Sequence, residues 1–431
     1  MTVAVSTALQ PRLDPEARLE PLHEEVVRAT LPLVGAHIDE IAPTFYRRMF
    51  SARPDLLTHT FNRGNQAQGA QQKALAASVA TYATLLVTPD SPSPREMLGR
   101  IGHKHASLGI TEDQYSVVHE HLMAAIVEVL GEDTVTAAVG AAWSAVYWHM
   151  AATLIDFERE LYASAGVAPG DVYREAVVVR RVQESSTVAS FELTAPAEAE
   201  PLPDFVPGQY TSVGVRLPDG ARQLRQYSLS DAPGAGRWRI TVRRVDAADP
   251  DPRGEVSSWI HAHVREGDRL QVTLPYGDLA LDTRSEEPVV LISNGIGVTP
   301  LLGMLGHLAA TQPHRRVRVL HADRDAGDTA HLQELVETVG GLPAAAGSHL
   351  ALWFPADIPV QSGITAAQQV TVHEGRMTIT KEHLPAGAQV YLCGSERFLQ
   401  GARDQLRALG VEEERVRFEL FSPNDWLLPV A

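Results

Sequence analysis

"VVLISNGIGVTPLLGML", residues 289–305, decides how the last third of this chain folds. The first four residues form an apolar run typical of a buried strand, and "TPLLGML" has the composition of an apolar helix. Between them, Gly295 and Gly297 allow the backbone to approach a ligand closely, and Pro300 suits the first turn of a helix. Strand, glycine loop and helix in this order predict a nucleotide-binding α/β fold, although the loop reads GxGxTP and lacks the third glycine of GxGxxG.

The same alternation continues downstream of this loop. "RVRVLHAD" (316–323) precedes the helical pattern "AHLQELVETV" (330–339), and "AQVYLCG" (388–394) precedes "RFLQGARDQLRALG" (397–410). Strands that alternate with helices are typical of a doubly wound parallel sheet. We therefore expect an α/β doubly wound domain over residues 285–431.

The middle of the chain has a different pattern of short alternating segments. Examples are "REAVVVRRVQESSTVASFEL" (174–193) and "RWRITVRRV" (237–245), with turn sequences such as "LPDGA" and "DAPGAG" between the segments. Apolar and polar residues that alternate with period two, interrupted by turns, predict an antiparallel barrel or sandwich. We assign this antiparallel β-barrel domain to residues 166–284.

The first third is helical in pattern. Apolar residues recur at helical spacing between 21 and 162, and the pattern breaks where Pro, Gly and Asp cluster. Residues 163–173, "ASAGVAPGDVY", have the composition of a linker. An all-α domain with a short N-terminal extension is therefore expected over residues 1–165, which makes the chain a multidomain protein.

Composition narrows the class of protein. A formal net charge of -16 argues against a general binder of nucleic acid or of anionic membranes. The single cysteine rules out an internal disulfide, and no apolar run approaches the ~20 residues needed to span a bilayer. The N-terminus lacks the pattern of a secretory signal. We expect a cytoplasmic protein without integral membrane association, and infer no obligate protein partner.

Two histidines stand close together in "GHKHASLG", residues 102–109. Because each helical residue turns by about 100°, Leu98, His105 and Leu108 share an apolar stripe, and His103 lies on nearly the opposite face, towards solvent. A histidine in such a stripe is either a metal ligand or a structural core residue bonded to a carbonyl group. Other polar side chains in apolar helical patterns are Tyr46, Gln71, Tyr115 and Glu158.

The motifs "FYRRMF", "FNRGNQAQGAQQKAL", "IGHKHASLGITEDQYSVVHEHL" and "FERELY" resemble the globin domain of the flavohaemoglobin (flavohemoprotein) family. The resemblance implies haem b with His105 as its iron ligand, and Lys104 is either near a haem propionate or a plain surface residue. It further implies that Tyr46 and Gln71 are a distal pair that hydrogen-bonds oxygen and that Phe61 wedges against the haem. Leu75 would be the distal gate, and Tyr115 and Glu158 the proximal pair that holds the histidine.

The barrel carries "LRQYSLS" (224–230) and "RGEVSSWI" (253–260). Arg225 and Tyr227 share one face of a strand, where a guanidinium suits a pyrophosphate, and the second motif predicts a turn into a helix N-terminus, which attracts phosphate. Together the motifs resemble the FAD domain of the ferredoxin–NADP reductase superfamily. The FAD-binding residues implied are Tyr210, Arg225, Gln226, Tyr227, Ser228, Gly254, Glu255, Val256 and Ser257.

The last domain resembles the NAD(P)-binding domain of the same superfamily. Its implied site residues are Gly295, Gly297, Val298, Thr299 and Pro300 in the glycine loop, Cys393 and Gly394 near the nicotinamide, and Phe421 covering the flavin. The chain departs from the family at Val298, at Ser395 and in the tail "LFSP", which bears on nucleotide affinity. Asp323 favours NADH and Arg324 would favour NADPH; we expect NADH.

The resemblance covers nearly the whole chain and implies a nitric oxide dioxygenase, which converts nitric oxide and oxygen to nitrate with electrons from NAD(P)H through FAD and haem. Two alternatives stay open. One is a haem-based gas sensor, and the other is an NADH-dependent flavin reductase or oxidase with another acceptor.

Overall fold

The computed structural model describes residues 19–59, 61, 63, 70–88, 94–234, 236–247, 253–355 and 369–421, with only the backbone described at 58, 59, 70–74, 76, 77, 94 and 96. The chain forms two compact units. Unit 1 comprises Met1–Pro54 and Gly69–Asp171, and unit 2 comprises Asp55–Gln68 and Val172–Ala431. The expected barrel and α/β parts both lie in unit 2, so the three-domain division at 165/166 and 284/285 stays a proposal.

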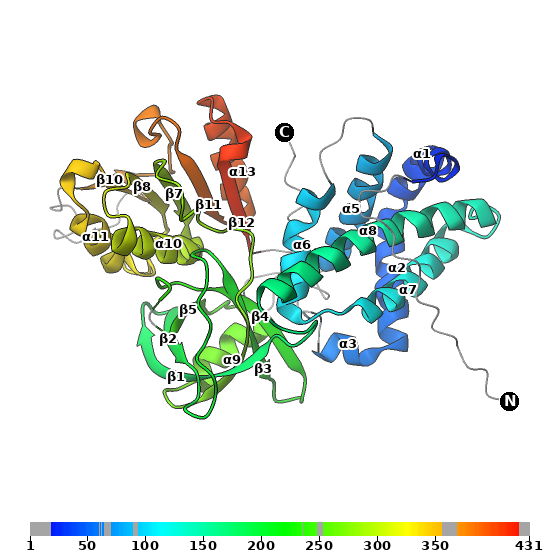
Figure 1. Cartoon of the computed structure of the whole chain (residues 1–431), viewed down its shortest axis with the longest axis horizontal. Helices are drawn as coiled ribbons and strands as arrows, with labels where there is room; N and C mark the ends of the chain where they lie inside the picture. The colour runs from blue at the N-terminus through cyan, green and yellow to red at the C-terminus, as the bar shows by residue number, and fades with distance from the viewer. Residues whose placement is uncertain are drawn as a thin grey trace. The chain divides into compact units, whose positions relative to one another are not determined.

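The described part of unit 1 is helical, as the apolar spacing predicts (Figure 1). Its helices are α1 (Pro21–Ala36), α2 (Ile38–Ala52), α5 (Ala70–Val87), α6 (Pro94–Leu108), α7 (Glu112–Leu130) and α8 (Ala137–Ser164). The ends of α7 follow from local chemistry: Thr111 and Gln114 form a capping box, and the helix stops at Gly131, whose φ is +82°. All of the short helix α3 (Pro54–His59) except Pro54 belongs to the 55–68 segment of unit 2.

Helix α8 supplies much of the core of unit 1. Trp143, Val146, Met150 and Leu154 are buried at helical spacing, and Glu158 continues the same stripe one turn further, also buried. The apolar pattern therefore carries a carboxylate into the interior, where it needs hydrogen-bond partners. Although α8 is long, no helix within the described residues is both long and apolar enough to cross a membrane.

In unit 2, an antiparallel sheet curls into a barrel, as expected. Leu229 bridges to Ile240, and the Ser230 N–H donates to the Arg239 carbonyl (2.8 Å), so the two end strands meet. Helix α9 (Glu255–His263) packs against the sheet. The strand order is β4-β3-β6-β1-β2-β5, with β1 (Tyr173–Gln183), β2 (Val188–Thr194), β3 (Tyr210–Arg216), β4 (Arg222–Ser228), β5 (Trp238–Arg243) and β6 (Arg269–Thr273).

A parallel sheet forms the rest of unit 2, which confirms the doubly wound prediction. The strands β7 (Val289–Asn294), β8 (Val317–Ala322), β9 (His349–Phe354), β10 (Val370–Glu374), β11 (Gln389–Gly394) and β12 (Val416–Leu420) are ordered β10-β9-β8-β7-β11-β12. The chain first moves from β7 towards β10 and then returns to the other side of β7. The switch point lies between β7 and β11, where open α/β sheets bind their ligands at the carboxyl ends of the strands.

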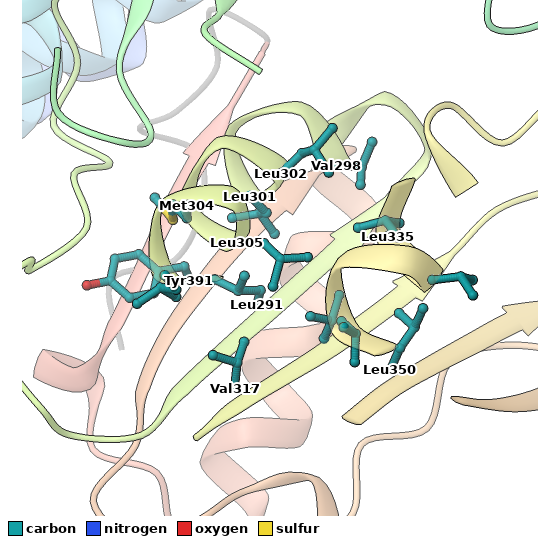
Figure 2. Close-up of a cluster of buried hydrophobic side chains, with 14 of the residues drawn as sticks. Leu291, Val298, Leu301, Leu302, Met304, Leu305, Val317, Leu335, Leu350 and Tyr391 are labelled. Atoms are coloured by element: carbon teal, nitrogen blue, oxygen red, sulfur yellow. The ribbon is translucent and has the colours of Figure 1, made fainter. Parts of the chain in front are cut away.

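Helices cover both faces of this sheet (Figure 1). Figure 2 shows the first face, where Leu301 and Leu305 of α10 (Val298–Thr311) lie over Leu291 of β7. Leu335 of α11 (Leu332–Gly341) belongs to the same cluster, and α11 packs beside β9. On the second face, Leu399 and neighbouring apolar residues of α13 (Glu396–Ala408) pack on alternate residues of the same strands. Burial on both faces explains why "VVLI" is uniformly apolar rather than alternating.

Candidate functional site

His105, the predicted iron ligand, has well-defined partners. Nδ1 of His105, on α6, lies 2.8 Å from Oε1 of Glu158 on α8 and 3.0 Å from the hydroxyl of Tyr115 on α7. The Tyr115 hydroxyl donates to the same carboxylate oxygen at 2.5 Å. Burial, reinforced by the Glu158 charge, raises the pKa of Tyr115 well above its usual value, so this hydroxyl stays protonated and donates.

This arrangement fixes the tautomer of His105. Oε1 of Glu158 already accepts from Tyr115, so the same oxygen accepts from Nδ1–H of His105, and Nε2 keeps its lone pair for a metal. The side chain of Glu158 is 3% exposed and that of His105 is 31% exposed. The described residues hold no group of three His, Cys, Asp or Glu side chains that could bind a metal ion directly. A single imidazole with a buried carboxylate behind it fits an iron that a porphyrin holds on its other sides.

The structure describes the side chains of some of the expected distal residues only. Tyr46 is buried on α2, with its ring 4.7 Å from that of Phe45 and 5.5 Å from that of Phe50, measured between centroids. Leu75 is half-buried on α5. Gln71 is in the same helix, but its side chain lies outside the described residues. Phe61 is partly buried and belongs to the 55–68 segment of unit 2.

The two remaining residues of the histidine motif are both half-buried on α6. For Lys104, a place near a haem propionate stays a prediction, with a plain surface residue as its alternative. For His103, the expectation of a solvent-facing ring is wrong in part, because the ring lies edge-on to Phe157 with centroids 5.4 Å apart. Helical geometry gives the face of a residue correctly but not what an adjacent helix places over that face.

In the barrel, β4 brings the predicted flavin residues together. Arg225 pairs in register with Val213 of β3, and Tyr227 pairs with Thr211, so the two side chains share a face. Burial lowers the pKa of the Arg225 guanidinium, whose hydrogen bonds go to the Leu224 carbonyl at 2.7 Å and to Oε1 of Gln223 at 3.4 Å. Within the described part of the chain, no carboxylate pairs directly with this largely desolvated guanidinium, which fits a phosphate group.

The neighbouring predicted residues have different surroundings. Gln226 donates to the hydroxyl of Ser212 at 3.1 Å. Ser228 is buried and pairs in register with Tyr210, which is also buried and whose backbone N–H and C=O bond to those of Tyr276 at 2.8 and 2.9 Å. This backbone pairing joins the first residue of β3 to Tyr276.

Helix α9 begins at the predicted phosphate-binding turn. Gly254 is its N-cap and Glu255 its first residue, and Val256 and Ser257 are buried in its first turn. The Ser257 hydroxyl accepts a hydrogen bond from the Val245 N–H at 3.2 Å. The N-terminal N–H groups of such a helix attract an anion.

The glycine loop lies at the switch point of the parallel sheet. Gly295, with φ +53°, opens the short helix η1 (Gly295–Gly297) directly after β7. A Cβ at Gly297 would lie 2.4 Å from the carbonyl oxygen of Cys393, at the end of β11. The fold therefore brings the loop against Cys393 and Gly394, and their proposed place near the nicotinamide stays a prediction. Val298, Thr299 and Pro300 start α10 in buried positions.

Two more predicted residues lie at the carboxyl edge of the sheet. Phe421 follows directly after Leu420, which pairs in register with Gly394, and it is 51% exposed. Asp323 follows β8, and its carboxylate accepts from the Arg324 N–H at 2.7 Å. Burial would raise the pKa of Asp323, but His321, the Arg324 N–H and Arg243 outweigh burial and lower it. The carboxylate is therefore ionised at this edge.

Comparison with known proteins places the chain in a family. A globin model matches residues 43–154, and an oxidoreductase NAD-binding domain model matches residues 291–404. The flavohemoprotein of Bordetella parapertussis is 40% identical over 411 residues, which cover 94% of this chain and 98% of that protein. The chain belongs to the flavohemoprotein family. The flavohemoprotein of Deinococcus radiodurans is 37% identical over 420 residues, covering 96% of this chain and 99% of that protein.

Solved structures agree with this assignment. The flavohemoglobin of Malassezia yamatoensis, determined with bound FAD and haem, matches with a TM-score of 0.82 and 33% identity, covering 94% of this chain and all of that one. The FAD/NAD-binding part of a nitric oxide dioxygenase from Vibrio cholerae matches with a TM-score of 0.50 and 34% identity, covering 57% of this chain and 98% of that one. As a flavohemoprotein with an NAD-binding oxidoreductase module, this chain is an oxidoreductase linked to NAD(P)H.

Of two further residues of this flavohemoprotein, the sequence indicates the first only through a motif that resembles the flavin-binding family, and it does not indicate the second. The buried hydroxyl of Tyr276 has no hydrogen-bond partner among the described residues, and burial raises its pKa. The motif "PYGDL" was the signal for it, since a buried tyrosine hydroxyl needs a partner that a flavin would offer. Arg63, which reaches Glu255 of α9, had no local signal at all.

Proposed function

We propose that this flavohemoprotein is a nitric oxide dioxygenase that binds haem b through His105, FAD on the barrel and NAD(P)H at the switch point of the parallel sheet. The hydrogen-bonded group His105–Glu158–Tyr115 carries the proposal. The site residues assigned above are part of it. The similarity of unit 2 to the FAD/NAD-binding part of the Vibrio cholerae nitric oxide dioxygenase supports the choice of reaction.

When bound, FAD supplies the exchange between hydride and single-electron transfer, and haem iron supplies the oxygen chemistry. Glu158 accepts the Nδ1 proton of His105 at 2.8 Å, which makes the imidazole a more strongly donating ligand. Tyr115 holds the same carboxylate oxygen and fixes its position. As a strongly donating ligand, this imidazole would favour oxygen activation over simple storage of oxygen.

In unit 2, Gly295 and Gly297 let the backbone approach a dinucleotide, and Arg225 and the first turn of α9 would hold the negative charge of the phosphates. The electron path ends on small uncharged gases, which need no large binding pocket. We propose no nucleic acid or obligate protein as a partner.

Consumption of nitric oxide by the protein loaded with haem and FAD tests the reaction. With NADH and oxygen present, nitrate should form in proportion to the nitric oxide consumed. A protein that holds both cofactors but consumes no nitric oxide would reject the dioxygenase. Rapid reduction of quinones or peroxides instead would favour the flavin reductase or oxidase.

Replacing Tyr46 by phenylalanine should speed the release of oxygen by roughly ten- to a hundredfold, because the proposed hydrogen bond to oxygen would be lost. Stopped-flow measurement of the oxygen dissociation rate checks this result. Tyr162→Phe is the matched control, because it removes another largely buried tyrosine hydroxyl, bonded to the Ile110 carbonyl at 2.6 Å. Equal rates in the wild type and Tyr46→Phe would remove Tyr46 from its role.

NADH should be preferred to NADPH. The ionised Asp323 carboxylate would repel a 2′-phosphate and can accept a hydrogen bond from a 2′-hydroxyl. Asp323→Asn should shift the ratio of kcat/KM for the two nucleotides towards NADPH by about tenfold, equal to about 1.4 kcal/mol. Asp325→Asn, an exposed change on the same loop, should leave the ratio unchanged. An unchanged ratio in Asp323→Asn would show that the carboxylate does not face the ribose.

A further inference from the structure

Arg63 makes an unusual set of contacts within unit 2. Its guanidinium donates to Oδ2 of Asp219 at 2.6 Å and to Oε1 of Glu255 at 2.9 Å. Its backbone N–H donates to Oε1 of Gln223 at 3.2 Å. The hydrogen bond with Asp219, opposed by burial and reinforced by Glu255, raises the pKa of Arg63. Arg63 is thus hydrogen-bonded to β4, to the turn before β4 and to α9.

The contact with Glu255 matters because of where that residue is. Glu255 is the first residue of α9, beside the N–H groups that we assign to the flavin pyrophosphate. A carboxylate is favourable at an empty helix N-terminus, but it repels a phosphate that binds at the same place. The sequence therefore puts a negative charge where the proposed ligand brings two more.

Gln223 extends the contact to the second phosphate-binding group. Its Oε1 accepts from the Arg63 N–H and from the guanidinium of Arg225, at 3.4 Å. Glu255 and Arg63 also act electrostatically on Arg225, in opposite directions. The site thus contains two guanidinium groups and the carboxylates of Glu255 and Asp219, so that the charges cancel. Without Arg63, the same cluster would be negative.

We propose that Arg63 is a positioning residue of the FAD site, which neutralises Glu255 so that the N-terminus of α9 can accept the flavin pyrophosphate. This inference rests on the proposed FAD site. In this proposal, Arg63 acts through its charge near the flavin phosphates and not through the isoalloxazine ring. Riboflavin, which has no phosphate, should therefore be insensitive to Arg63.

The test is a double-mutant cycle read by flavin binding, using the full-length protein after removal of its flavin. Quenching of flavin fluorescence gives the Kd of FAD for the wild type, Arg63→Gln, Glu255→Gln and the double variant. Arg63→Gln should raise the Kd by about tenfold, the scale of one like-charge contact near a protein surface. Glu255→Gln should tighten binding by about threefold. The double variant should return to within about threefold of the wild type, because the uncompensated carboxylate is gone.

Arg180→Gln is the matched control, because it removes a surface guanidinium of the barrel that pairs with Glu192 at 3.1 Å. It should not change the Kd of FAD. If Arg63→Gln binds FAD as tightly as the wild type, or if adding Glu255→Gln brings no recovery, charge neutralisation is overturned. An equal loss of riboflavin affinity would also overturn it, since that indicates general damage. A wild-type protein that binds no FAD would instead reject the proposed function itself.

Discussion

His105→Ala should yield a protein that is yellow where the wild type is red-brown. In the proposed site, His105 is the protein's only bond to iron, and its Nδ1–H is held by Glu158 at 2.8 Å. Alanine therefore removes the ligand and leaves Glu158 with Tyr115 as its remaining described partner. The Soret band should fall to a few per cent of the wild-type value per mole of protein. Flavin absorbance should stay, because the predicted FAD residues belong to unit 2. Visible spectra of protein grown with added haem measure both cofactors at once.

His103→Ala is the matched control for this change. It removes a ring two residues away on the same helix, whose described contact is with Phe157. It should keep the full Soret band. A red-brown His105→Ala protein would show that another residue binds the iron, and the assignment of the proximal site would then be wrong.

His105 and Glu158 show what helical periodicity can predict and what it cannot. A repeat of 3.6 residues places Glu158 in the same stripe as Leu154, and it places His105 in line with Leu98. Periodicity therefore predicts that both polar groups turn inward. It cannot predict that a histidine and a carboxylate 53 positions apart meet at hydrogen-bond distance, because that depends on how α6 packs on α8. The family resemblance supplied the pairing.

The glycine loop was predictable for a different reason. Its chemistry is contained in consecutive residues, so strand, Gly295, Gly297 and helix could be read in order. The position of Cys393 beside the loop follows from sheet topology, since β11 lies next to β7. The order of the strands in the sequence does not by itself predict that Cys393 lies beside the loop, because three strands separate β7 from β11. The prediction also needs the rule that ligands bind where the strand order reverses.

The ion pair between Arg63 and Glu255 could not be predicted from the sequence. Its partner Glu255 is 192 positions away, and both lie among ordinary polar residues without a periodic pattern. Ion pairs between distant segments leave no local signal, because a charged residue is compatible with almost any exposed position. The compensation of Glu255 by Arg63 is therefore visible only in the folded chain.

Gly297→Ala should lower the rate of flavin reduction by NADH by about a hundredfold, with haem and FAD still bound. The new Cβ would lie 2.4 Å from the Cys393 oxygen and 2.7 Å from the Gly394 nitrogen, which are backbone atoms of a strand held between two neighbours. The loop must move away from β11, at a cost of about 1–3 kcal/mol in folding free energy. That movement opens the crevice in which the nicotinamide must approach the flavin. Stopped-flow reduction at saturating NADH measures the effect.

The control is Gly306→Ala on α10, where the new Cβ meets its nearest neighbour at an ordinary 3.5 Å. The flavin of this variant should be reduced at the normal rate. If both variants reduce at the wild-type rate, the nicotinamide does not lie at the junction of Gly297 and Cys393.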